Sequence, residues 1–82
     1  MTTALGTDEL RELIAALTAD ALLIDAHGRE LAAHARALDL LPEAPPSCVA
    51  ALHQQAENCA AAGTGLRHAA ATLLRHAAAL DM

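Results

Sequence analysis

Five histidines are the residues of this sequence with the clearest capacity for metal chemistry. They are His27, His34, His53, His68 and His76. Two histidines four residues apart on a helix can share one metal ion, and no pair here has that spacing. A Glu-x-x-His sequence, typical of di-metal helical bundles, is also absent. We therefore expect no metal-binding residues and place the histidines beside the contact between helices, with a weak interfacial metal site or a pH response as the alternative.

The two cysteines, Cys48 and Cys59, could form a disulfide, bind a metal or act as nucleophiles. On one helix their separation in sequence corresponds to about 16 Å, whereas a disulfide needs Cα atoms within about 7 Å. We expect two buried, reduced thiols, with an intermolecular bridge or a metal role as the alternative. A nucleophile at Cys48 would need a base such as His53 and a concave site, which two helices do not form. We predict no enzymatic activity, no catalytic residues and no cofactor.

The composition indicates helices that pack closely in one small domain, residues 1–82. Alanine and leucine dominate, both strong helix formers, and Phe, Tyr and Trp are absent. A chain of 82 residues buries only about 60% of its unfolded surface, so its own core gives marginal stability. Without aromatic side chains, that core has to come from close approach of helices carrying Leu and Ala.

The charge argues against a nucleic-acid partner, and the distribution of apolar residues argues against a membrane span. The net charge is −5 and the sequence contains no lysine, so a phosphate backbone would find no basic surface, and we expect no nucleic-acid binding. No apolar run approaches the roughly 20 residues of a membrane span, and the first residues lack the features of a signal peptide. We expect a cytoplasmic protein, with export without a cleaved signal peptide as the alternative.

One cluster of helix-breaking residues divides the chain. Three prolines, Pro42, Pro45 and Pro46, lie within a few residues, and proline both removes a donor and clashes inside a helix. The sequence predicts a helix over about 8–41, a short turn, and a helix over about 47–80. Thr7 is the expected N-cap of the first helix; Ser47 as the cap, or Pro46 as the first helical residue, would start the second.

Apolar residues repeat every seven positions in both halves, which predicts that the two helices pack along one seam. In the first half the repeats are Leu10, Leu17, Ile24, Leu31 and Leu38, interleaved with Ile14, Ala21, Gly28 and Ala35. In the second they are Leu52, Cys59, Leu66, Leu73 and Leu80, interleaved with Val49, Ala56, Gly63, Ala70 and Ala77.

An antiparallel hairpin folded about the Glu43–Ala44 link brings the two series together. In this register most layers join one large and one small residue, for example Leu31 with Ala56, which keeps packing dense. The layer of Gly28 and Cys59 is thin, and it could admit a bulky side chain from a partner or mark a kink. Flanking charges agree with the register, because Arg11 can approach Asp81, Asp25 can approach Arg67, and Asp39 can approach His53.

Several large leucines lie outside the seam and predict a partner. They are Leu13, Leu22, Leu23, Leu40, Leu41 and Leu74. A single hairpin would expose them, and two hairpins in a four-helix bundle would bury them. We expect these leucines to form the interface with another helical chain, as a homodimer or a heterodimer. Replacing both Leu22 and Leu23 with Asp should then prevent association.

The chain resembles the small helical-hairpin proteins of the actinobacterial type VII (ESX) secretion systems. In the sequence Pro45-Pro46-Ser47-Cys48-Val49-Ala50, a degenerate turn motif, Cys48 and Ala50 stand where that family has the Trp and Gly of its Trp-x-Gly turn. The stretch Gly65-Leu66-Arg67-His68-Ala69-Ala70-Ala71 is similar to the Gly-Leu-Arg-Ala-Ala-Ala stretch of ESX secretion-associated relatives. The family's Tyr-x-x-x-Asp export signal is absent, since Ala77 stands four residues before Asp81. The resemblance implies a partner subunit of a heterodimer or a secretion adaptor, rather than an autonomous substrate.

Two other functions fit the same residues. One is a cytosolic regulatory or antitoxin-like helical homodimer. The other is a metal-buffering helical bundle that uses Cys48, Cys59 and the histidines.

Overall fold

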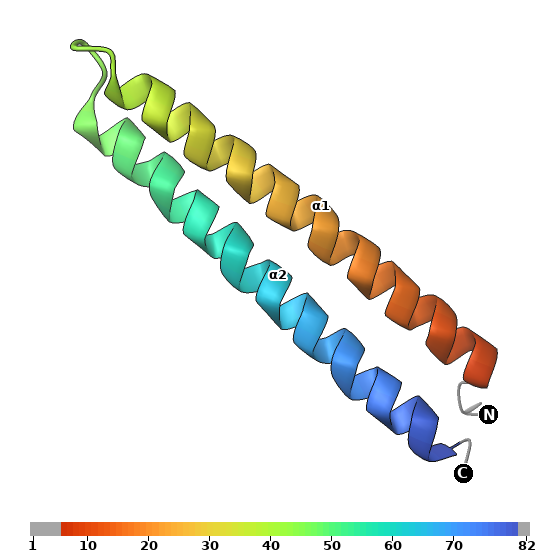
Figure 1. Ribbon diagram of the computed structural model, residues 1–82. Helices are drawn as coiled ribbons and strands as arrows, with labels where there is room; N and C mark the ends of the chain where they lie inside the picture. Colours follow the sequence, from red (N-terminus) through yellow and green to blue (C-terminus); the bar gives the residue numbers. More distant parts are fainter. Residues whose placement is uncertain (1–5, 81–82) are drawn as a thin grey trace, which may run out of the picture.

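The computed structural model describes residues 6–80, which form two long antiparallel helices side by side (Figure 1). Helix α1 spans Thr7–Asp39 and helix α2 spans Pro46–Leu80, and residues 40–45 connect them. The described ends of the chain lie together at one end of the hairpin, opposite the turn. The predicted all-α helical hairpin is therefore confirmed.

The start of α1 differs from the prediction. Gly6, in an extended conformation, is the N-cap, and no side chain caps the helix. The Gly6 carbonyl accepts the first helical hydrogen bond, from the Leu10 N–H at 3.0 Å, which places Thr7 inside the helix. The expectation that Thr7 is the cap was therefore wrong. Asp8 and Glu9 still place negative charge in the first turn, where it complements the helix dipole.

The turn is built from hydrogen bonds that close the end of α1 before Pro42. The Leu40 and Leu41 N–H groups bond the Ala37 and Leu38 carbonyls, at 3.3 and 3.0 Å, so the last bonds tighten to the spacing of a 3₁₀ turn. Helix α1 thus ends two residues earlier than the predicted boundary at 41. Helix α2 begins at Pro46, one of the two predicted starts. Proline suits this position because the N–H groups of the first turn have no partner within the helix, so the N–H that proline lacks is not missed.

The seam is arranged as buried small residues between half-buried large ones. Ala21, Ala35, Ala70 and Ala77 are at most 7% exposed, while among the large apolar residues that the structure describes only Leu10 is buried. The remaining seam residues are half-buried, apart from the buried glycines and exposed Leu80. Alanine in one helix lets the other approach closely, and the leucines then extend to both flanks of the contact. The hairpin therefore leaves large side chains partly open on two faces.

Gly28 shows how close this approach is. A Cβ atom at Gly28 would lie 2.9 Å from the Cys59 Cβ and 3.3 Å from the Ala56 carbonyl oxygen. The predicted layer of Gly28 with Cys59 is therefore present, and it is thin because the two backbones are close.

Replacing Gly28 with Ala should destabilise the hairpin. Alanine gains about 1 kcal/mol of helix propensity, but forcing a methyl group against the Cys59 Cβ costs about 1–3 kcal/mol. We expect a net loss of about 1 kcal/mol in the free energy of unfolding, measured by urea titration with circular dichroism. In a double-mutant cycle with Cys59→Gly, the two losses should sum to more than the loss in the double variant. A Gly28→Ala variant more stable than the wild type would contradict the close approach.

The hairpin is a rod with more surface than a globular monomer of its mass. Its radius of gyration is 18.3 Å and its extents are 60 × 25 × 14 Å, whereas a compact domain of this length has a radius of gyration of about 12 Å. The accessible surface is 5943 Å², and a compact monomer of this mass exposes about 4,600 Å². The excess of about 1,300 Å² is surface that one hairpin alone cannot bury.

Candidate interaction site

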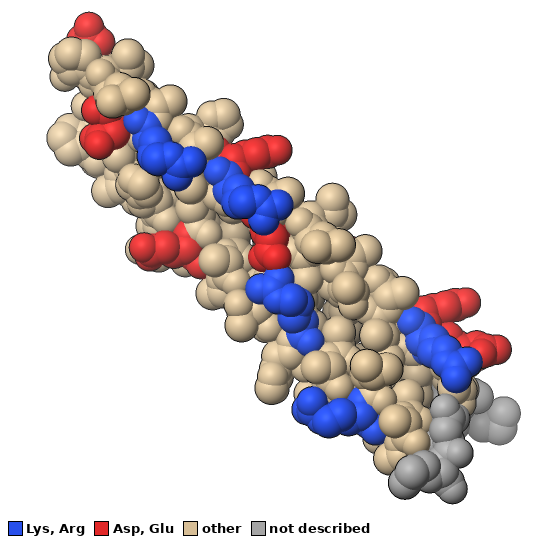
Figure 2. All heavy atoms as spheres, in the orientation of Figure 1, with Lys and Arg blue, Asp and Glu red and all other residues tan. Residues whose placement is uncertain are grey.

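The two open faces of the hairpin differ in charge. The face on which Asp25 meets Arg67 is called the charged face. The heptad positions on that flank of the seam also hold Leu22 and Leu74. Its charged residues are Asp8, Arg11, Asp25, Arg29, Arg36, Asp39, Glu57 and Arg67. In Figure 2, arginine and acidic side chains follow one another along the face in view. Burying so many charges against a partner would carry a large desolvation cost.

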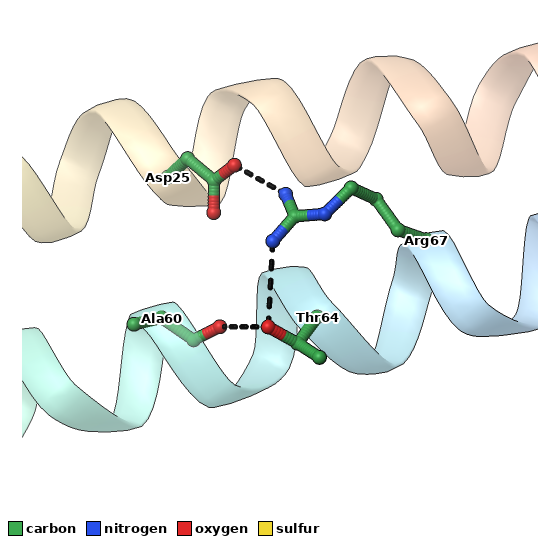
Figure 3. Close-up of polar contacts among 4 residues, drawn as sticks. All are labelled: Asp25, Ala60, Thr64 and Arg67. Carbon is green, nitrogen blue, oxygen red and sulfur yellow. Dashed lines mark hydrogen bonds and ion pairs between the residues drawn. The ribbon is translucent and has the colours of Figure 1, made fainter.

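The Asp25–Arg67 pair connects the two helices on the charged face, as predicted (Figure 3). An Arg67 guanidinium nitrogen donates to the Asp25 carboxylate, and the other bonds Thr64 Oγ1 at 3.4 Å. Gly63 makes room for this pair, because a Cβ atom there would clash with Asp25 Oδ1. The Arg67 side chain is half exposed, so the pair contributes about 0–1 kcal/mol and fixes register more than it stabilises.

The other two predicted charge contacts have different outcomes. Asp81 lies outside the described residues, so its approach to Arg11 is not described. Asp39 and His53, both described, form no ion pair. Arg11 lies 3.9 Å from Asp8 in the preceding turn.

An open groove of about 340 Å³ lies on the charged face beside the thin Gly28 layer. It is lined by Asp25, Gly28, Arg29, Ala32, Ala56, Glu57 and Ala60. Small residues from both helices form its apolar floor and charged residues its rim. The sequence indicated the missing side-chain volume at Gly28. It did not show that Ala32 and Ala60 widen the groove, because that depends on which flank of the seam they occupy.

We call the opposite side the low-charge face. Its strongly charged residues are Glu9, Asp20 and Glu30. On α1 its larger side chains are Leu13, Leu23, His27 and His34. On α2 it consists mainly of small side chains, beside the larger Gln55, Asn58 and His76. The small ones are Cys48, Ala51, Ala62, Gly65, Ala69, Thr72 and Ala79. The cores of protein interfaces are depleted in charged residues, so this face is the better candidate for association.

Gly65 on this face has no structural explanation within the hairpin. A Cβ atom at Gly65 would meet nothing within 4 Å. A glycine inside a helix costs about 1 kcal/mol relative to alanine, and here the chain itself gains no close contact in return. The sequence shows that Gly65 is a glycine within a helical pattern, but it does not show that the space around Gly65 is open.

The six leucines assigned to a partner interface are exposed, by between 40% for Leu13 and 83% for Leu40. The structure divides them between faces. Leu13 and Leu23 belong to the low-charge face, Leu22 and Leu74 belong to the charged face, and Leu40 and Leu41 lie in the turn that follows α1. Leu80, expected in the seam, is 58% exposed.

The residues singled out for chemistry remain apart. Both cysteines are free, and neither is buried as expected. Cys59 is half-buried in the seam, and Cys48 is exposed because it lies in the first turn of α2 on the flank of the seam. All five histidines are exposed, and His68 lies on the outer side of α2 rather than beside the seam. Within residues 6–80 no group of three His, Cys, Asp or Glu side chains is arranged to hold a metal ion.

Neither helix, over the residues described, combines the length and apolar character needed to cross a membrane. Comparisons with family models, curated proteins and solved structures found no match to this chain.

Proposed function

We propose that this chain is a non-enzymatic interaction protein that completes a four-helix bundle with a second helical chain. The observation that carries the proposal is the unburied surface of the hairpin. The chain exposes about 1,300 Å² more than a compact monomer, and a standard protein interface buries about 800 Å² on each partner. Half-buried seam leucines such as Leu17 and Leu66 supply apolar area that a second hairpin would cover.

The resemblance to type VII secretion proteins gives this proposal a biological setting. In that setting the chain would act as the partner subunit of a helical heterodimer, which leaves the cell without a cleaved signal peptide. The mechanism would be burial of Leu and Ala between hairpins. Co-expression with neighbouring genes, followed by co-purification, tests this role separately from association itself.

The solution mass of the purified chain tests the proposal. Size exclusion with light scattering should be combined with circular dichroism on the same peak, with detection by refractive index because the chain has no aromatic residues. We expect either a helical species of at least twice the chain mass of 8.4 kDa or a poorly folded chain that becomes helical with its partner. A fully helical, cooperatively unfolding monomer would contradict the proposal.

A further inference from the structure

The low-charge face is divided unequally between the two helices. Its α1 half carries large side chains, including Leu23, which is 70% exposed. Its α2 half carries mainly small ones, including Gly65, where an added Cβ atom would meet nothing within 4 Å. A face with large residues on one half and small residues on the other is complementary to a copy of itself.

We propose that the low-charge face binds a second copy of this chain about a two-fold axis parallel to the hairpin, with α1 of each copy packed on α2 of the other. This inference rests on the proposed function and names its partner and its surface. The excess surface of about 1,300 Å² on each copy exceeds the roughly 800 Å² that a standard interface buries on one partner.

Closed two-fold symmetry fixes the register of such a dimer, because residues of α1 then face the α2 residues of the other copy at the same height. The height scale comes from the observed layer of Gly28 and Cys59. Counted from that layer at 1.5 Å per residue, Leu23 and Gly65 lie within about 1.5 Å of the same height. The Leu23 side chain of each copy therefore packs on Gly65 of the other, which explains a glycine that the hairpin alone does not need.

The same register places Glu30 of one copy beside Asn58 of the other. Glu30 lies within about 1.5 Å of the height of Asn58, and both are on the low-charge face. The Asn58 Oδ1 accepts a hydrogen bond from Gln54 Nε2 at 3.0 Å, so Asn58 presents its Nδ2 donor to a carboxylate. A two-fold axis perpendicular to the hairpin would instead place α1 on α1, with large side chains opposed.

Adjacent leucines provide a matched pair of variants. Leu22 and Leu23 are 66% and 70% exposed but belong to opposite faces. The substitution Leu23→Asp should weaken self-association at least about 30-fold, as expected for loss of a central interface anchor. The same substitution at Leu22 has the same helix-propensity cost and should change the dissociation constant less than about threefold. Sedimentation equilibrium measures both, and circular dichroism of each variant reports its helix content.

Cross-linking tests the register independently of folding stability. In a chain with Cys48→Ser and Cys59→Ala, the pair Leu23→Cys and Gly65→Cys should form a covalent dimer on mild oxidation. Within one hairpin these positions lie on different helices and point away from each other, so an intrachain bridge is not expected. Leu22→Cys with Gly65→Cys, and Leu23→Cys alone, should stay unlinked.

The outcomes separate this inference from the proposed function. A dimer that dissociates with Leu22→Asp rather than Leu23→Asp, or that links through Leu23→Cys alone, would overturn the inference and leave association standing. A poorly folded wild-type monomer would overturn the second copy in favour of a different helical partner. A stable, fully helical monomer would overturn both.

Discussion

Replacing Ala35 with Leu should unfold most of the hairpin at a temperature where the wild type is folded. Ala35 is 0% exposed and lies in the seam between the two helices, so the added atoms have no free volume. Overpacking of this kind costs about 1–3 kcal/mol, and in a domain of this size each kcal/mol lowers the midpoint of thermal unfolding by about 4–8 °C. We expect a decrease of about 10 °C or more, measured by circular dichroism.

Ala33 provides the control for this substitution. It lies on the same helix, is exposed and faces away from the seam. Ala33→Leu makes the same chemical change with a similar helix propensity, so the midpoint should move by less than about 2 °C. Equal effects at the two positions would show that the helices do not approach along the line of buried alanines.

A second large effect is expected at Leu73, where the seam is covered, but not at Leu80, where it is open. Both leucines occupy the same heptad position of α2, and Leu73 is half-buried whereas Leu80 is 58% exposed. Leu73→Asn should lower the free energy of unfolding by about 2–3 kcal/mol, because it loses apolar burial and places an amide in the seam. Leu80→Asn should change it by less than about 0.5 kcal/mol. Urea titration of both variants is the measurement, and a large loss at Leu80 would contradict the observed end of the seam.

The difference between Leu73 and Leu80 shows which features of the fold the sequence could predict. The seven-residue repeat predicted two helices and one seam, since only residues on the same side of a helix recur at that spacing. It also predicted the layer of Gly28 with Cys59 and the contact of Asp25 with Arg67, because both follow from a single register. The repeat does not reveal where the opposite helix ends. In that register Leu80 meets Thr7, the first residue of α1, so within residues 6–80 no further turn of α1 covers it.

The ends of α1 and the faces of the hairpin depend on details beyond the apolar pattern. Gly6, rather than a side chain with a capping oxygen, provides the N-cap, and the bonds of the Leu40 and Leu41 N–H groups close α1 ahead of Pro42. The exposed leucines were assigned to one partner surface by their absence from the seam alone. Adjacent residues such as Leu22 and Leu23 project about 100° apart on a helix, which was the signal that they serve different faces.

The glycines illustrate the same distinction between pattern and environment. Gly28, Gly63 and Gly65 are alike in sequence, each an unfavourable residue within a helix. In the structure Gly28 permits backbone approach, Gly63 accommodates an ion pair, and Gly65 faces open space. That difference is one reason why we propose that a second chain binds the low-charge face.

The dependence of thermal unfolding on protein concentration tests the central claim, that folding is completed by association. For two chains of 82 residues the unfolding enthalpy is about 115 kcal/mol, so linkage of folding to dimerisation should raise the midpoint by roughly 9 °C over a hundredfold increase in concentration. We expect circular dichroism to record that rise. A cooperative transition with the same midpoint at every concentration would show that the hairpin is complete as a monomer and would contradict the account.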